Sequence, residues 1–443
     1  MKVLIITYNM VPYSPNWGSC QRVFFLADHL AVKGWSVHVV SAKTDYYGNL
    51  GREPKFVQHL LEPTHWLYRK HLGVAGSHSS QPGAPGSPQK IPAPQSGSAL
   101  KRLLKAGLHF HLGGFDPVVE LKAALWMAGQ VGYLRRLMRE HAFDAVVISG
   151  PPFSVFAAVD DLKREPGCPP VILDYRDPWY FLDGRWSPQA GREARLLRKA
   201  DSVVVTTDSL RGAMVSRFGL DAGKVHVITN GFCESDWARV ADAPRENRGP
   251  RCRFAHIGSV SFDAATQRNA MPLLRAYAAW SGRNEAQLAF VGASAPPGSW
   301  PESVRFLPVM SAEDALKEMA RSDVLILLPT TERIGRKYIM PGKFYDYLKS
   351  GKVVYGIGSE DCFFNTRIEA HGLGIVSPNT EEDIGRTLEH LLGRWKDGVL
   401  SDVRADRDVR MEAYAREYQN ETYAMRIQAS VDVHRESSAG TRS

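Results

Sequence analysis

Two kinds of hydrophobic pattern alternate along the chain. Short runs rich in β-branched residues, at 2–9 and 35–42, are typical of parallel strands that are buried on both faces. Between them, residues 20–34 carry apolar side chains at helical spacing, and Gly34 ends the segment. A strand, a helix and a second strand in this order predict a βαβ unit, the start of a doubly wound sheet.

The same alternation fills the rest of the chain in two series. In the first half, further strand segments lie at 143–152, 169–179, 200–210 and 224–232. The polar stretch 241–251 breaks both periodicities and predicts a domain boundary. A second series follows, with strand segments at 253–260, 286–294, 304–310, 323–329, 353–358 and 372–378.

We therefore expect an α/β protein of two Rossmann-like domains, each a doubly wound parallel sheet. Residues 1–240 would form the first domain and residues 251–405 the second, while residues 406–443 would form a C-terminal helix and tail that crosses back to the first domain. Neither half carries the GxGxxG fingerprint of dinucleotide enzymes. Doubly wound sheets bind ligands at the carboxyl ends of their strands, which predicts a ligand in a cleft between the two domains.

Two segments depart from the pattern. Of the 26 residues at 73–98, sixteen are Gly, Pro or Ser, which predicts a disordered insertion because too little apolar surface is available for burial. Residues 99–112 are basic and amphipathic, with Lys101, Arg102 and Lys105 beside a leucine face. This helix would either pack on the first domain or lie in a membrane surface.

The composition excludes several classes of protein. Apolar residues make up 44% and charged residues 23% of the 443 positions, unlike a disordered chain, a collagen or a coiled-coil rod. Five scattered cysteines without a CxxC pair favour a reducing compartment. No apolar run reaches the length of a membrane span, and the N-terminus lacks the pattern of a secretory signal. We expect a cytoplasmic protein.

Charge is distributed unevenly. Residues 1–170 have a net charge of +7, against +1 for the remainder of the chain. A basic first half indicates an anionic partner, namely an anionic membrane, a phosphorylated substrate or a nucleic acid. An ordinary solvated surface with a modest excess of cations is the alternative. No nucleic-acid recognition motif is present, so nucleic acid is not an expected partner.

The segment from Met340 to Gly351 is the most informative. Pro341 suits the first turn of a helix, and the helix N-terminus offers amides and a positive dipole end to a phosphate. Lys343 adds a point charge, and Asp346 can accept hydrogen bonds from a pair of sugar hydroxyls. This arrangement fits a nucleoside diphosphate, while an ordinary surface helix with a Lys–Asp pair three residues apart fits the spacing equally well.

Four segments in matching order resemble a GT-B glycosyltransferase of family 4, in particular the subgroup that builds lipid-linked bacterial surface glycans. They are VLIITYNMVP with WSVHVV, VVISGPP with VILDYRDPW, ADSVVVTTDSL with VHVITNGF, and FAHIGSV through MPGKFYDYLKSGKVV. The resemblance covers most of residues 1–370 apart from the insertion near 45–115.

By this resemblance, the second half binds the nucleotide and the ribose is gripped by Asp346. Many relatives have a second Glu near the donor sugar, where this chain has Tyr338, so the paired-carboxylate motif is incomplete. The other positions that the resemblance places at the donor are Gly258, Ser259, Arg268 and Lys343 at the diphosphate, Gly292, Phe306, Leu307 and Pro308 near the nucleobase, and Met340, Pro341 and Gly342 at the start of the helix.

In the first half, the resemblance places Gly18 in the loop that approaches the donor phosphate and the acceptor. Relatives often carry a His at the end of the strand that here reads VILDYRDPW, where this chain has Arg176 followed by Asp177. An arginine at the ligand edge of a sheet can stabilise a leaving diphosphate, and Asp177 would orient it or meet an acceptor hydroxyl. The alternative is an ion pair that closes a loop.

The weaker candidates are not assigned chemistry. Asp406–Asp408 matches the DxD metal pattern of a different fold, but it opens the predicted tail helix and is interpreted as a solvated turn. No metal site, P-loop, GxSxG or HExxH motif is expected.

The resemblance implies a retaining transferase that needs neither a metal nor a cofactor. It would move a sugar from a nucleotide diphosphate sugar, of the UDP type, to a hydroxyl of a glycan or polyprenyl-linked glycan at the inner face of a membrane. Catalysis would be electrostatic, with Arg268, Lys343 and Arg176 assisting departure of the diphosphate. The rival interpretations are an epimerase or hydrolase of sugar nucleotides on the same fold, and a catalytically degenerate binder of nucleotide sugars or glycans.

Overall fold

The computed structural model describes residues 1–14, 17–44, 53–68, 116–179, 188–241, 249–263, 269–328, 337–405 and 410–440. Four features expected from the sequence lie outside these ranges: the insertion at 73–98, the basic helix at 99–112, Arg268 and the Asp406–Asp408 turn. Among the described residues, no helix has the length and apolar character that crossing a membrane requires.

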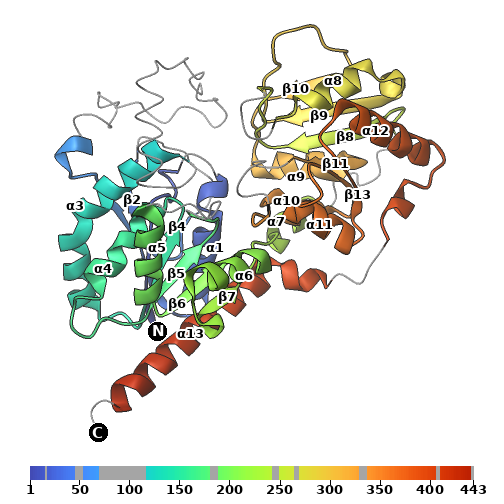
Figure 1. Cartoon of the computed structure of the whole chain (residues 1–443). Coiled ribbons are helices and arrows are strands. Elements are labelled where there is room, and N and C mark those ends of the chain that lie inside the picture. The colour runs from blue at the N-terminus through green and yellow to red at the C-terminus, as the bar shows by residue number, and fades with distance from the viewer. Residues whose placement is uncertain are drawn as a thin grey trace. The chain divides into compact units, whose positions relative to one another are not determined.

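The chain folds into two compact units, each built around one parallel sheet (Figure 1). The second unit runs from Asn230 to Arg416. The first unit contains the chain up to Thr229 and resumes at Glu417, so the chain leaves it and later returns. The expectation of two doubly wound sheets is confirmed.

The first unit is centred on a seven-stranded sheet in the order β3-β2-β1-β4-β5-β6-β7. Its strands are β1 (Lys2–Thr7), β2 (Ser36–Ala42), β3 (Val57–Leu61), β4 (Ala145–Gly150), β5 (Val171–Tyr175), β6 (Ser202–Val205) and β7 (Val225–Val227). Every residue of β4, β5 and β6 is buried, as expected of strands that helices cover on both faces. The strand order reverses between β1 and β4, so the ligand edge of this sheet lies at their carboxyl ends.

Helices cover this sheet. They are α1 (Gln21–Val32), α3 (Pro117–His141), α4 (Ala158–Leu162), α5 (Pro188–Lys199), α6 (Asp208–Phe218) and α13 (Arg416–Gly440), with short 3-10 turns η1 (Trp17–Ser19), η3 (Phe153–Ala157) and η4 (Ala222–Lys224). Helices α3, α4 and α5 lie side by side in the first unit (Figure 1). Helices α1 and α13 share one apolar cluster with β1, β2 and β4.

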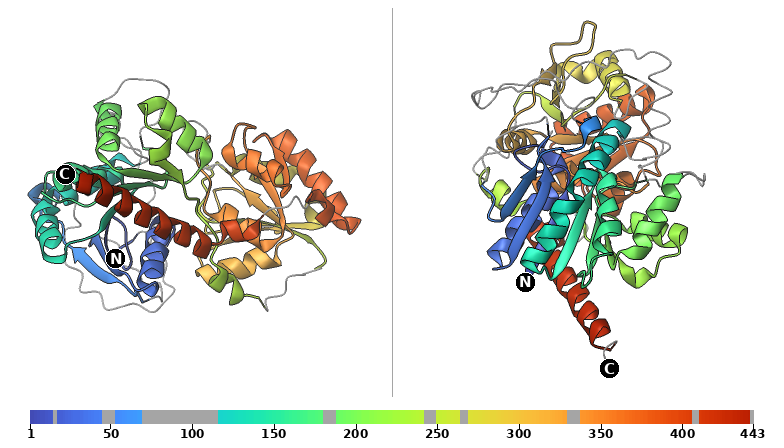
Figure 2. Two further views of the ribbon diagram at one scale, coloured as in Figure 1. Left: turned by 90° about the horizontal axis from the view of Figure 1, so that it is seen from below. Right: turned by 90° about the vertical axis from the view of Figure 1, so that its left-hand side faces the viewer.

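Helix α13 crosses the first unit (Figure 2), which confirms that the C-terminal helix returns there. Asn420 donates from Nδ2 to the carbonyl of Phe25 on α1 at 3.1 Å. Glu421 pairs with His29 at 3.0 Å and with Lys33 at 2.6 Å. The apolar residues that α13 buries in the shared cluster are Tyr423, Ala424, Ile427 and Val431. The continuous helix begins at Arg416, ten residues after the start of the segment 406–443 that was predicted to form the C-terminal helix and tail.

A buried ion pair ties α1 to the centre of the sheet. Arg22 on α1 lies 3.1 Å from the carboxylate of Asp174 on β5, and both side chains are buried. The hydroxyl of Ser149 on β4 donates to Asp174 Oδ2 at 2.7 Å. Arg22 also donates to the carbonyls of Ile228 and Thr229, both at 2.9 Å. These bonds supply the partners that a buried charge pair requires.

The second unit is centred on a six-stranded sheet in the order β10-β9-β8-β11-β12-β13. Its strands are β8 (Cys252–Ile257), β9 (Ala286–Val291), β10 (Val304–Leu307), β11 (Val324–Leu327), β12 (Val353–Ile357) and β13 (Gly374–Ser377). Its helices are α7 (Glu234–Ala238), α8 (Met271–Ala279), α9 (Ala312–Arg321), α10 (Lys343–Ser350), α11 (Phe363–Ala370) and α12 (Glu381–Lys396), with 3-10 turns η5 (Ser281–Asn284), η6 (Leu400–Val403) and η7 (Met411–Tyr414).

Successive residues of β8 belong to different cores. Phe254 packs in a cluster with residues of α8 and α12, whereas Ala255 and Ile257 pack with residues of α7, α9, α10 and α11. This alternation is the period of two that a strand between two helical layers requires. The strand order reverses between β8 and β11, so the ligand edge of the second sheet lies at the carboxyl end of β8.

Candidate functional site

Two glycine turns meet at the carboxyl end of β8. Gly258, which follows β8, has φ +116°, and Gly292, which follows β9, has φ +87°. The Gly258 amide donates to the Val291 carbonyl, and the Gly292 amide donates to the Leu307 carbonyl, both at 2.8 Å. A Cβ built on Gly292 would lie 3.4 Å from the carbonyl carbon of Gly258. The two turns therefore pack backbone against backbone at the switch point of the sheet.

The ammonium group of Lys343 lies directly over Gly258. A Cβ built on Gly258 would lie 2.8 Å from Lys343 Nζ, closer than ordinary packing allows. The backbone angle favours glycine at position 258, and a larger residue there would also have to displace the end of the Lys343 side chain. The sequence analysis places both residues at the same ligand group, and the structure brings them together.

His256 holds the other side of this lysine. The imidazole is completely buried, with Nδ1 3.0 Å from the Ile326 carbonyl oxygen and Nε2 3.0 Å from Lys343 Nζ. The sequence analysis missed His256. The available signal was a histidine among the apolar residues at the end of a strand, two residues before the Gly258–Ser259 turn.

Helix α10 presents its N-terminus at the same place. It begins at Lys343, with Gly342 in helical conformation as its N-cap and no side chain capping it. Pro341 precedes the helix and accepts the amide of Phe344 at 2.9 Å, so it does not fill the first turn as predicted. Met340 and Pro341 are buried, and Gly342 is exposed. The first turn of α10 thus offers its dipole end beside the lysine.

Asp346 lies one turn further along α10 and is half-buried. It accepts a hydrogen bond from Trp237 Nε1 on α7 at 3.2 Å. Burial raises the pKa of the Asp346 carboxyl to about 6, against the lowering effects of the Trp237 hydrogen bond and the Arg416 charge. A carboxyl with a raised pKa at a ligand edge is a candidate for ligand binding. Trp237 was not among the sequence predictions.

The remaining predicted donor positions surround the turns. Phe306 on β10 stacks on Phe290, with ring centroids 5.6 Å apart, while Leu307 accepts the Gly292 amide. Ser259 and Pro308 are exposed. Tyr338 is half-buried and follows the undescribed residues 329–336. Roles for these residues toward a base or a sugar stay predictions.

In the first unit, Arg176 binds loops together at the ligand edge. Its Nε donates to the Gly150 carbonyl at 3.1 Å. Its two terminal nitrogens donate to the carbonyls of Ser19 and Pro151. Burial lowers the pKa of its guanidinium. Arg176 therefore joins the ends of β4 and β5 to η1, which contains Gly18, and its expected role toward a diphosphate stays a prediction.

The positions next to Arg176 differ in their surroundings. Asp177 is half-buried, and its charge opposes the lowering of the Arg176 pKa. Gly18 is exposed in η1. Trp179 is buried and stacks on Phe153 with centroids 5.5 Å apart. The structure thus places Gly18 and Arg176 in one region of the first unit.

A buried carboxyl shapes the loop after β4. Glu120 on α3 accepts the amides of Phe153 and Ser154, both at 2.9 Å, and the Ser154 hydroxyl at 2.8 Å. Burial raises its pKa to about 7 even though these bonds lower it. The sequence analysis missed Glu120, because its partners lie more than thirty residues away.

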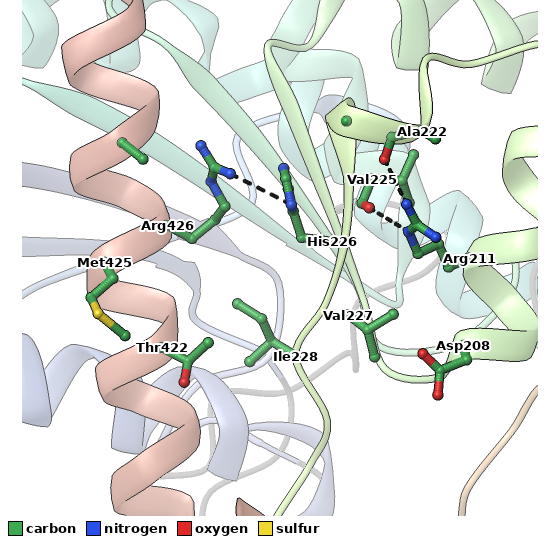
Figure 3. A pocket seen from close by; sticks show the side chains of 12 residues that line it. Asp208, Arg211, Ala222, Val225, His226, Val227, Ile228, Thr422, Met425 and Arg426 are labelled. Carbon is green, nitrogen blue, oxygen red and sulfur yellow. Dashed lines mark hydrogen bonds between the residues drawn. The ribbon is translucent and has the colours of Figure 1, made fainter.

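A cavity of about 590 Å³ lies in the first unit between α6, β7 and α13 (Figure 3). Arg426 on α13 and His226 on β7 point toward one another across it, 3.5 Å apart, while Arg211 approaches β7 from α6. Burial, followed by the charges of Arg426 and Arg211, lowers the pKa of His226 to about 4. Arg211 is engaged by the carbonyls of Ala222 and Val225, so the basic groups do not converge on one ligand position.

Among the residues that the structure describes, no group of three His, Cys, Asp or Glu side chains is placed to hold a metal ion. His38 on β2 and His59 on β3 bond each other at 3.0 Å, and His59 also bonds the Tyr133 hydroxyl at 2.7 Å. This histidine pair belongs to the packing of the first unit.

Comparison with known proteins shows the fold and finds one family model that matches part of the chain. Residues 84–234 match the model of glycosyltransferase family 4. No curated protein matches the chain. Among solved structures, Anabaena HepE in complex with UDP and glucose is 13% identical, has a TM-score of 0.58, and the match covers 97% of this chain and 99% of HepE.

Two further solved structures have the same architecture. The α,α-trehalose 6-phosphate synthase of Burkholderia multivorans is 12% identical with a TM-score of 0.62, covering 100% of this chain and 98% of that protein. The UDP-GlcNAc 2-epimerase of Methanocaldococcus jannaschii is 10% identical with a TM-score of 0.53, covering 97% of this chain and all of the epimerase. At these identities the likenesses show the fold, and the two Rossmann-like sheets form the GT-B fold that the sequence predicts.

Proposed function

We propose that this chain of the GT-B fold is a family 4 glycosyltransferase, which transfers a sugar from a UDP sugar to a hydroxyl group of a glycan or a lipid-linked glycan. The observation that carries the proposal is the ammonium of Lys343 over the Gly258 turn, at the switch point of the second sheet and at the N-terminus of α10. A cation, a helix dipole and a side-chain-free turn together suit a diphosphate.

The choice of donor rests on Asp346 and on the comparisons. A half-buried carboxylate one turn from Lys343 suits the two hydroxyls of a ribose. Anabaena HepE has been solved with UDP and glucose, and the E. coli trehalose-6-phosphate protein, which has a TM-score of 0.61, with UDP-2-fluoro glucose. These complexes favour UDP among the nucleotides for a chain of this fold.

The proposed chemistry is electrostatic. Developing negative charge on the leaving diphosphate would be stabilised by Lys343, by the first amides of α10, and by Arg268. Arg176 acts in the proposal by holding the loops at the ligand edge of the first unit, because three backbone carbonyls already engage its guanidinium. Retention of configuration, with the acceptor attacking on the face that the diphosphate leaves, follows the family resemblance.

The first experiment is a thermal shift of the purified protein with UDP, GDP, ADP, TDP and CMP. We expect stabilisation by UDP that is reduced in Lys343→Ala and retained in the matched variant Lys349→Ala. Lys349 lies on the same helix but pairs with Glu234 at 2.7 Å. If no nucleotide stabilises the protein, the GT-B fold is unaffected, but the result favours a glycan-binding or catalytically degenerate protein over a transferase.

A UDP-sugar assay with and without acceptor separates the transferase from its rivals. The 2-epimerase of the same fold makes that rival concrete. Consumption of the donor only when a glycan acceptor is present supports the transferase. Epimerised or hydrolysed sugar without acceptor would instead establish one of the rival activities, and UDP binding without turnover would point to a degenerate site in which Tyr338 replaces the usual glutamate.

A lipid-linked acceptor, as in the bacterial surface-glycan subgroup, implies contact with a membrane. The basic residues Lys101, Arg102 and Lys105 motivate this part of the proposal. We expect the protein to float with vesicles that contain anionic lipid, and the triple alanine variant to float less. Equal flotation of the two proteins would exclude this contact.

A further inference from the structure

The structure assigns a role to His256 that deepens the proposed function and rests on it. We propose that His256 is a positioning residue, whose neutral imidazole holds the Lys343 ammonium at the place where the diphosphate of the donor binds.

The hydrogen bonds fix the tautomer of His256. The Ile326 carbonyl oxygen, 3.0 Å from Nδ1, can only accept, so Nδ1 carries the proton. In the neutral ring Nε2 is then unprotonated and can only accept a hydrogen bond, which the Lys343 ammonium 3.0 Å away donates. An imidazole protonated at both nitrogens would face the ammonium with an N–H and lose this bond. The contact therefore defines the neutral Nδ1–H form.

A neutral acceptor suits a lysine that must bind an anion. A carboxylate in place of His256 would hold Lys343 equally well, but its charge would cancel the charge offered to the phosphate. The imidazole directs the lysine without that loss. The bond to His256 Nε2 uses one of the three ammonium protons and leaves the positive charge of Lys343 unchanged.

The support for His256 is rigid, which makes the positioning effective. The imidazole is completely buried on β8, and β11, which contains Ile326, pairs with β8. A lysine side chain has about 2 kcal/mol of rotamer entropy. Holding its end group before the ligand arrives removes part of that cost from binding. Gly258 supplies the space on the other side of the same ammonium.

The test is a double-mutant cycle on UDP affinity, measured by isothermal titration calorimetry. His256→Asn keeps a donor for Ile326 but does not reach Lys343, and we expect it to weaken UDP binding about tenfold. In the Lys343→Ala background the same change should cost less than twofold, because His256 acts through that lysine. His256→Gln, whose amide oxygen reaches the place of Nε2, should recover most of the affinity.

His371→Asn is the matched control, since His371 lies in the same unit, is half-buried and bonds the Tyr414 hydroxyl at 3.1 Å, away from Lys343. It should leave UDP affinity unchanged. Equal losses from His256→Asn with and without Lys343, or no loss at all, would overturn the positioning role. If the wild-type protein binds no nucleoside diphosphate, the proposed function itself is wrong. This result is distinguishable from failure of the positioning role, because then none of the variants in the cycle binds UDP either.

A second measurement does not depend on a folded His256 variant. In the ¹⁵N spectrum of the full chain, His256 Nε2 should appear as an unprotonated nitrogen, and Lys343→Ala should move it downfield by removing its donor. An Nε2 that carries the proton, or a resonance that Lys343→Ala does not move, contradicts the assignment.

Discussion

At the scale of single residues, the candidate site depends on a glycine beside the lysine. Gly258 combines a positive φ with a cation 2.8 Å from where a Cβ would stand. Gly351, which ends α10 with φ +73°, has the same kind of backbone but nothing within 4 Å of its Cβ position. The pair separates backbone strain from the displacement of Lys343.

We expect Gly258→Ala and Gly351→Ala each to destabilise the fold by about 1–2 kcal/mol, since both force a non-glycine residue into positive φ. Only Gly258→Ala should also weaken UDP binding, by at least tenfold, because the new methyl group displaces Lys343. Thermal melting and calorimetry of the two variants measure both effects. Equal UDP affinities in the two variants would show that the Lys343 position does not matter to the ligand.

The effect of Asp346 on folding stability changes with pH in the opposite direction to that of a carboxylate whose pKa the fold lowers. Its pKa is about 6 in the fold, above the 3.8 of an unperturbed Asp. The native state therefore holds the proton more tightly than the unfolded chain, so the contribution of Asp346 to stability falls as pH rises from about 4 to 6.

Asp346→Asn removes this charge while keeping an oxygen for Trp237. We expect the variant to melt a few degrees higher than wild type at pH 7, and to bind UDP about tenfold more weakly. Wild-type affinity should fall as pH drops from 7 to 5, whereas the affinity of the variant should stay flat over that range. A pH-independent wild type would place the ionisation of Asp346 outside the ligand site.

At the scale of elements, two kinds of polar contact hold α1 and α13 in the first unit. The Arg22–Asp174 pair is buried, and the Arg22 guanidinium also lies 5.7 Å from the centre of the Tyr423 ring on α13. The pairs of Glu421 with His29 and Lys33 are partly exposed. Burial, not the number of ion pairs, should decide which contact matters, because water screens exposed pairs.

Asp174→Ala leaves the Arg22 charge buried without its carboxylate and should cost about 3–5 kcal/mol in the free energy of unfolding. Glu421→Ala, on the surface of α13, should cost about 1 kcal/mol or less. Urea denaturation followed by circular dichroism provides the comparison. Similar losses from the two variants would mean that the buried network adds nothing beyond a surface pair.

At the scale of the whole molecule, the proposed UDP-binding residues and the Arg22 network belong to different units. Calorimetric unfolding should therefore show two transitions, one of which Asp174→Ala lowers. UDP should raise the other transition, and Lys343→Ala should reduce that rise. A single transition that both changes move would show that the units unfold together.

Local pattern in the sequence was enough to predict most elements and several site positions. The β-branched runs predicted the strands, and the spacing of residues 341–351 predicted the helix that carries Lys343 and Asp346. Boundaries that depend on capping were less accurate, since α10 begins after Pro341 and α13 begins only at Arg416. The local sequence pattern does not show which carbonyl or side chain forms the hydrogen bonds that end a helix.

Only the tertiary structure decided which distant residues act together. His256 meets Lys343 across 87 positions, and Arg22 meets Asp174 across 152. Trp237 reaches Asp346 across 109. These contacts follow from the order of strands in each sheet, which side-chain periodicity does not specify. The sequence thus determined which segments are strands and helices and where a phosphate is expected, whereas the sheet order determined which buried histidine supports the lysine, because strands distant in sequence become neighbours only when the sheet is assembled.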